Sequence, residues 1–164
     1  MAFRTVAAAL AACVGLAGAT PALADEWVVL TGAGTRTVVV ANVGSIERAD
    51  GVLHADIFVF PQDPSQADML QARAVLTCGR NIMNSQQTIY YDLTTEGGKV
   101  TGLRHLREEV STFDPATGNG TWYGLSSAVY GVLSPLCAGT PAGGERVRGD
   151  ENEVVMALGG RFVR

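Results

Sequence analysis

The sequence predicts an α+β domain: a single antiparallel β-sheet of about six strands, one C-terminal helix packed on it and one disulfide. Three observations lead to this prediction. Runs rich in β-branched residues follow one another between residues 26 and 110, with short glycine-containing turns between them. The apolar spacing then becomes helical over 126–137. Two cysteines remain once a predicted export signal is removed.

Short turns join the predicted strands, so consecutive strands are expected to pair antiparallel. Residues 26–31 and 35–41 form a first hairpin across a Gly-Ala-Gly turn. Residues 52–60 form the clearest strand, because alternate positions are apolar on one face and the second face turns apolar near its end. The remaining predicted strands cover 71–78, 82–93 and 100–110.

A late change of period predicts the helix. Apolar residues between Val129 and Leu136 recur at helical spacing, and Ser126 or Ser127 supplies an N-cap. Pro135 comes late enough to end the helix or to tighten its last turn. Strands first and one helix last are typical of an α+β domain, which is assigned to residues 25–137.

Residues 138–164 are expected to form a loosely held C-terminal tail. They begin with a glycine-containing linker, and a charged stretch, 145–153, follows it. Val154–Leu158 is apolar enough for a last strand or a helical turn, so an added edge strand is the alternative.

The first 24 residues are expected to be an export signal that is removed after Ala24. Arg4 precedes a run of small and apolar residues, and Pro21 and an Ala-x-Ala end follow this run. The run is too short and too rich in alanine and glycine to predict a membrane span, and no later stretch predicts one. A lipoprotein acylated at Cys13 is the alternative, although the apolar run continues past that cysteine.

The composition excludes two classes of protein. The 164 residues are 47% hydrophobic and 17% charged, which is too apolar and too weakly charged for a disordered protein. The chain has 12 Lys and Arg against 16 Asp and Glu, whereas a nucleic-acid binder has a basic excess. Loss of Arg4 with the signal changes the formal charge from −4 to −5.

Cys78 and Cys137 remain in the mature chain, and an even count in an exported protein predicts a disulfide. The bridge would close a loop of 59 residues, for which the chain-entropy model gives about 4 kcal/mol of stabilisation. A redox-active or metal-binding thiol pair is the alternative. It is disfavoured because no Cys-x-x-Cys motif is present and the two histidines, His54 and His105, lie far apart.

No catalytic, cofactor or metal site is predicted. His54 and His105 fall on the strand faces expected to be less buried, and the sequence pairs neither with a nucleophile. Glu108 and Glu109 are adjacent, so on a strand they point to opposite faces. The chain contains no Gly-x-Ser-x-Gly, P-loop or His-Glu-x-x-His motif.

Two pairs of aromatic residues are the candidate partner-binding features. Tyr90–Tyr91 places one ring on each face of a predicted strand, and Trp122–Tyr123 precedes the helix. Tyr90, Trp122 and Tyr123 are therefore candidate contacts, because exposed aromatic side chains often anchor protein interfaces. The alternative is that these rings pack in the core.

A set of features occurs in order over about residues 26–137. They are Trp27, the step Asn42–Ile46, the strand Ala72–Cys78, the Tyr90–Tyr91 strand, Trp122, and a helix from Ser126 to Cys137. In these features the chain resembles the surface-adhesin protein E-like family of small exported proteins of Gram-negative bacteria. The resemblance implies an antiparallel sheet, a C-terminal helix and a Cys78–Cys137 bridge. The namesake activity of that family is adhesion to host extracellular-matrix and serum proteins.

These features predict a non-enzymatic exported protein, in the periplasm or at the cell surface, that binds a ligand or another envelope or extracellular protein. Nucleic acid, a cofactor and a membrane span are not expected. A homodimer through a sheet edge is an alternative mode of association. Two other functions stay open, a structural or assembly component of the envelope and an enzyme with an unrecognised site.

Overall fold

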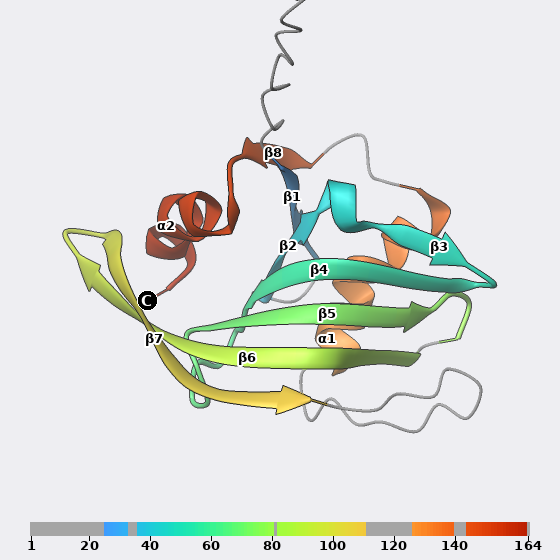
Figure 1. Ribbon diagram of the computed structural model, residues 1–164, viewed down its shortest axis with the longest axis horizontal. Coiled ribbons are helices and arrows are strands. Elements are labelled where there is room, and N and C mark those ends of the chain that lie inside the picture. The colour runs from blue at the N-terminus through green and yellow to red at the C-terminus, as the bar shows by residue number, and fades with distance from the viewer. Residues whose placement is uncertain (1–24, 33–35, 81, 111–125, 140–143, 164) are drawn as a thin grey trace, which may run out of the picture.

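The structure is a computed structural model that describes residues 25–32, 36–80, 82–110, 126–139 and 144–163 (Figure 1). In chain order the elements are β1 (Glu26–Thr31), β2 (Val38–Asn42), the 3₁₀ helix η1 (Val43–Ser45), β3 (Glu47–Ala49), β4 (Val52–Phe60), β5 (Met69–Thr77), β6 (Ile82–Glu96), β7 (Lys99–Val110), α1 (Ser126–Leu133), the 3₁₀ helix η2 (Ser134–Ala138), β8 (Glu145–Arg148) and α2 (Glu151–Phe162).

Within these ranges the strands form one antiparallel sheet of eight strands. The order along the sheet is β7-β6-β5-β4-β2-β1-β8, and β3 pairs with the first part of β4. The predicted α+β class and single antiparallel sheet are confirmed. The two additional strands, β3 and β8, have three and four residues and mostly charged side chains, so they carry no alternating apolar pattern.

One face of the sheet is covered by α1, which lies behind β4, β5 and β6 in Figure 1, and by η2. The apolar residues whose spacing predicted the helix are buried there: Val129, Val132, Leu133 and Leu136. The tightening expected at Pro135 occurs as η2. The predicted Cys78–Cys137 disulfide is present and joins the residue after β5 to η2.

The expectation of a loosely held tail is wrong for residues 145–162. β8 pairs antiparallel with β1, so an edge strand is added at Glu145–Arg148, whereas residues 154–158, for which a strand or a helical turn was the alternative, belong to α2. α2 follows and begins at a capping box: Glu153 N donates to Asp150 Oδ1 at 2.9 Å, and Asp150 N donates to Glu153 Oε2 at 3.0 Å. The charged stretch therefore contains the capping residues at which α2 begins, and it is not a solvated tail.

α2 covers part of the opposite face of the sheet, where the aromatic residues of β1 and β4 lie. Trp27 stacks on Phe58 with ring centroids 4.9 Å apart, and its Nε1 donates to the carbonyl oxygen of Gly149 at 3.1 Å. Phe60 contacts Phe162 at the end of α2. The apolar end of the second face of β4 is thus buried against α2 and β1.

α2 also approaches the β6–β7 hairpin closely, because glycines face the strands there. A Cβ on Gly159 would lie 2.6 Å from Val100 Cγ2, and a Cβ on Gly160 would overlap the carbonyl oxygen of Gly98. The register between β6 and β7 shifts twice, and the end of the hairpin lies next to α2 (Figure 1). α2 therefore links the β8 edge of the sheet to the hairpin at the other edge.

Candidate functional site

α2 leaves the middle of its face of the sheet uncovered, and the surface is hollowed there beside the helix. Two adjoining hollows of about 170 and 100 Å³ share Gln71 and Glu151. We call these two hollows together the sheet groove. Its lining comes from β4–β7 and the first turns of α2: Asp56, Phe58, Met69, Gln71, Ala72, Arg73, Gln87, Ile89, Tyr91, Leu103, Glu151, Asn152 and Val155.

Strand register explains why these side chains meet. Residues opposite each other on antiparallel strands point to the same face of a sheet. The register produces two rows across neighbouring strands: Asp56, Arg73 and Gln87, and then Gln71, Ile89 and Glu108. Tyr91 belongs to the next row, opposite Met69 on β5 and His105 on β7. Polar and apolar side chains therefore alternate along the uncovered part of this face.

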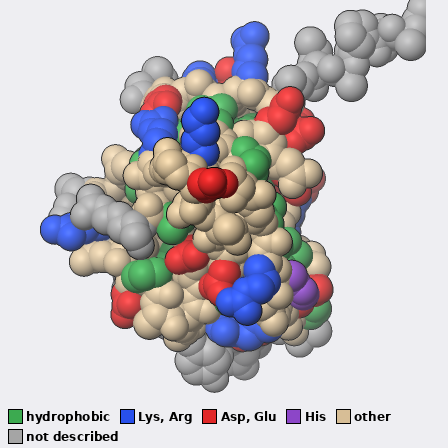
Figure 2. Space-filling view, turned by 90° about the vertical axis from the view of Figure 1, so that its left-hand side faces the viewer, with side chains coloured by type: hydrophobic (Ala, Val, Ile, Leu, Met, Phe, Trp, Pro, Cys, Tyr) green, Lys and Arg blue, Asp and Glu red, His purple; other side chains and the backbone are tan. Residues whose placement is uncertain are grey.

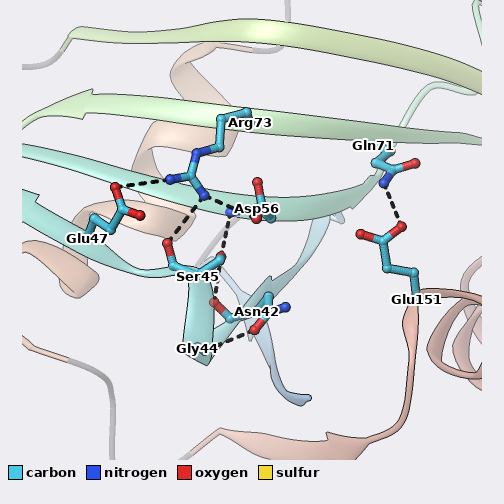
Figure 3. Close-up of polar contacts among 8 residues, drawn as sticks. All are labelled: Asn42, Gly44, Ser45, Glu47, Asp56, Gln71, Arg73 and Glu151. Carbon is cyan, nitrogen blue, oxygen red and sulfur yellow. Dashed lines mark hydrogen bonds and ion pairs between the residues drawn. The ribbon is translucent and has the colours of Figure 1, made fainter. Parts of the chain in front are cut away.

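At one end of the groove Arg73 is held by two carboxylates (Figure 3). Its guanidinium lies 3.3 Å from Glu47 Oε2 and 3.1 Å from Asp56 Oδ2, and it donates to the carbonyl oxygen of Ser45 at 3.3 Å. The Ser45 hydroxyl accepts a hydrogen bond from Asp56 N at 2.8 Å and donates to the carbonyl oxygen of Asn42 at 3.0 Å. The arginine therefore joins η1 to the sheet, and its charge is compensated.

At the other end the first turn of α2 forms a wall of the groove. Gln71 Nε2 donates to Glu151 Oε2 at 2.9 Å (Figure 3), and the Tyr91 hydroxyl donates to Gln71 Oε1 at 3.3 Å. Gln71 thus links a strand of the floor to the helix. On β7, Glu108 Oε1 accepts from Gln87 Nε2 at 2.7 Å, so a second carboxylate is positioned by an amide of the floor.

Both of these carboxylates act on the Tyr91 phenol. Burial raises the pKa of the Tyr91 hydroxyl above its ordinary value, and the negative charges of Glu151 and Glu108 raise this pKa further. The phenol therefore stays protonated at neutral pH, as its hydrogen bond to Gln71 requires.

One apolar side chain that lines the groove is exposed, and so is one on α2. Leu103, which lines it, is 38% exposed, and Met156 on the next turn of α2 is 42% exposed. On the side of the molecule that carries α2 and the β6–β7 turn, Figure 2 shows hydrophobic side chains in small groups between acidic and basic ones. A partner would therefore meet local apolar contacts on this side rather than one broad apolar patch.

The structure places Tyr90 in the core, so this candidate contact is not an exposed anchor. Its side chain is 5% exposed and belongs to the cluster under α1. The Arg107 guanidinium lies 3.7 Å from the centre of its ring, and its hydroxyl donates to Glu109 Oε2 at 3.1 Å. Of the Tyr90–Tyr91 pair it is Tyr91 that lines the groove, because α1 covers the other face.

The two histidines, for which no catalytic role was predicted, lie on strands that do not pair with each other. His54 is half-buried on β4, and His105 is exposed on β7 with its ring centre 5.9 Å from that of Tyr91. Trp122 and Tyr123 lie outside the described residues, as do the expected signal 1–24 and its Cys13. The residues that sequence reasoning missed are Arg73, Gln71 and Glu151.

Two further features of the described residues bear on chemistry. The described residues contain no group of three or more His, Cys, Asp or Glu side chains that could hold a metal ion. A larger cleft of about 290 Å³ lies beside Phe162. Its Arg161 donates to both carboxylate oxygens of Glu145, at 2.7 and 2.9 Å. Its Asp68 accepts a hydrogen bond from Leu93 N. Arg161 and Asp68 thus have structural roles, Arg36 is the third charged residue that lines this cleft, and we take the sheet groove as the candidate site.

None of the helices in the described part of the chain is long and apolar enough to cross a membrane. Comparison with known proteins found no matching family model, no matching curated protein and no matching solved structure. Among the described residues, the sheet groove is the candidate site from which a function can be proposed.

Proposed function

We propose that the protein is a non-enzymatic, exported protein of the cell envelope that binds a segment of another protein in the sheet groove. The observation that carries the proposal is a preformed groove with fixed walls and partly exposed apolar side chains. One wall is α2, which is anchored in a buried cluster containing Trp27, Phe58 and Leu158. Binding sites are usually preformed concave surfaces that combine apolar side chains with a few positioned polar groups.

The location outside the cytoplasm is supported by two observations. The sequence of residues 1–24 is typical of an export signal. The Cys78–Cys137 disulfide is typical of proteins that fold in an oxidising compartment. The periplasm or the cell surface is the proposed site, and a lipid tether at Cys13 is the alternative.

We further propose membership of the surface-adhesin protein E-like family. The antiparallel sheet, the late helix and the bridge between them are the features that this resemblance implies, and all of them are present. Adhesion is then one form that protein binding in the groove takes.

Replacing Leu103 by arginine is expected to abolish capture of the partner from envelope extract. The longer, charged side chain would occupy the mouth of the groove, whereas Leu103 is already 38% exposed and contributes little to the core. Ala49→Arg is the control, since it introduces the same side chain at an exposed strand position on β3. Quantitative mass spectrometry of the captured proteins provides the measurement. The same partner set with Leu103→Arg as with the wild type would refute the groove as the binding site.

Assembly through a sheet edge is the second candidate function. β7 has 12 residues and, among the described residues, pairs only with β6. Its register shifts twice against β6, and most of its side chains from Arg104 to Glu109 are charged. Bulges and charges are features by which natural sheets oppose edge pairing, so a homodimer through this edge ranks behind the groove.

A further inference from the structure

We propose that the occupant of the sheet groove is an extended peptide segment that bears lysine or arginine side chains. This inference rests on the proposed function and adds the chemistry of the partner. Three properties of the groove carry it: the size of its hollows, the sign of its uncompensated charge and the aromatic and apolar groups between the charges.

The size of the hollows favours side chains over a small molecule. At about 170 and 100 Å³ each is smaller than the sites that enclose a drug-sized ligand. Each has room for about one side chain. The two hollows adjoin at Gln71 and Glu151, so they suit successive side chains on one face of an extended peptide.

The uncompensated charge at the groove is negative. Arg73 lies between Glu47 and Asp56 and is compensated by them. Glu108 and Glu151, in contrast, accept their hydrogen bonds from the neutral amides of Gln87 and Gln71. Within the described residues neither of these two carboxylates is in an ion pair. The arginines of β7 do not neutralise these two carboxylates, because Arg104 pairs with Asp92 and Arg107 pairs with Glu109.

Glu151 lines the groove, and Glu108 lies beside it on β7, where it accepts a hydrogen bond from the lining residue Gln87. Gln71, Ile89 and Glu108 are opposite one another on three consecutive strands, so the backbones at Gln71 and Glu108 are about 10 Å apart. Glu151 reaches Gln71 from α2. The Tyr91 hydroxyl is bonded to Gln71, which also binds Glu151; burial raises the pKa of this hydroxyl, and the charges of Glu151 and Glu108 raise it further.

This arrangement suits a long cationic side chain. The aliphatic stem of a lysine or arginine packs on apolar groups, for which Ile89 and Leu103 are available. The charged head is stabilised by carboxylates and by the face of an aromatic ring, here that of Tyr91. The negative formal charge, −4 for the whole sequence and −5 without the signal, adds a long-range attraction for a basic partner.

The test uses three peptides of about ten residues in which valine alternates with lysine, with glutamine or with glutamate. Each is titrated into the labelled protein, and affinity and amide chemical shifts are followed by NMR. The lysine peptide is expected to shift Ile89, Tyr91 and Leu103 and to bind about tenfold more tightly than the glutamine peptide. Its affinity should also fall as salt is added.

Matched variants assign the effect to the two carboxylates. Glu108→Gln and Glu151→Gln are each expected to weaken binding of the lysine peptide about threefold, and the double variant about tenfold. Asp50→Asn is the control, because it removes one negative charge at an exposed turn, and asparagine tolerates the positive φ found there.

Two outcomes would overturn the inference. Equal or tighter binding of the glutamine or glutamate peptide at the groove would refute the cationic partner while the groove itself remained a binding site. Absence of groove shifts with all three peptides would refute an extended basic segment. Capture by wild type but not by Leu103→Arg would in either case still support the proposed function, so the two claims fail separately.

Discussion

Removal of the Cys78–Cys137 disulfide is expected to lower the free energy of unfolding by about 3 kcal/mol. The bridge spans 59 residues, and the chain-entropy model gives about 4 kcal/mol for a loop of that size, from which native-state strain subtracts. The bridge joins the end of β5 to η2, which follows directly on α1. Without it, α1 and η2 depend on their apolar contacts alone to stay on the sheet.

The variant is Cys78→Ser with Cys137→Ser, since a single replacement would leave a free thiol. Both side chains are half-buried, so serine is accommodated without a large cavity. Thermal unfolding is expected to shift down by about 10 °C for a domain of this size. Adding a reductant should lower the melting temperature of the wild type and leave that of the double variant unchanged. Equal melting temperatures for the oxidised wild type and the double variant would contradict the predicted role of the bridge.

Gly160→Ala is expected to destabilise the protein by about 1 kcal/mol, although alanine is the better helix former. In a helix interior the replacement ordinarily gains about 1 kcal/mol. At this position the new methyl group would overlap the carbonyl oxygen of Gly98, which is backbone and cannot rotate away. Overpacking of this kind costs about 1–3 kcal/mol, so the clash outweighs the gain. α2 must move off the hairpin, and the groove wall at Glu151 moves with it.

Gly131→Ala in α1 is the matched control for Gly160→Ala. Nothing lies within 4 Å of a Cβ built at Gly131, so the helix gain is expected without the clash. The free energy of unfolding should rise by about 0.5–1 kcal/mol. Urea unfolding of the two variants measures both effects. A rise in stability with Gly160→Ala as with Gly131→Ala would show that α2 does not pack on the β6–β7 hairpin.

The regular elements of this fold could be predicted because their periodicity lies in the sequence. β4 alternates along its length, and Val129 to Leu136 recur at helical spacing. α2 was missed because its charged first residues resemble a solvated stretch. The Asp150–Glu153 capping box is nonetheless visible in the sequence, and it is the signal that could have identified the helix start.

Less of the candidate site than of the fold could be predicted from the sequence. Gln71 and Glu151 are 80 residues apart and meet only because β8 and α2 return across the sheet. The choice between Tyr90 and Tyr91 depended on which face α1 covers, and both faces of that strand are mixed. The alternation of a strand predicts one ring on each face of the sheet, and the packing of α1 determines which of the two rings is accessible.

The most direct test of the groove is site-specific photo-crosslinking in intact cells. A photoreactive side chain replaces Leu103, which lines the groove, and in a separate variant Arg80, which is exposed in the turn after β5. A discrete crosslinked partner is expected from position 103, none from position 80, and less product from position 103 when Glu108→Gln and Glu151→Gln are added. Equal products from positions 103 and 80, or no product from position 103, would contradict the claim that this protein acts by binding a partner in the sheet groove.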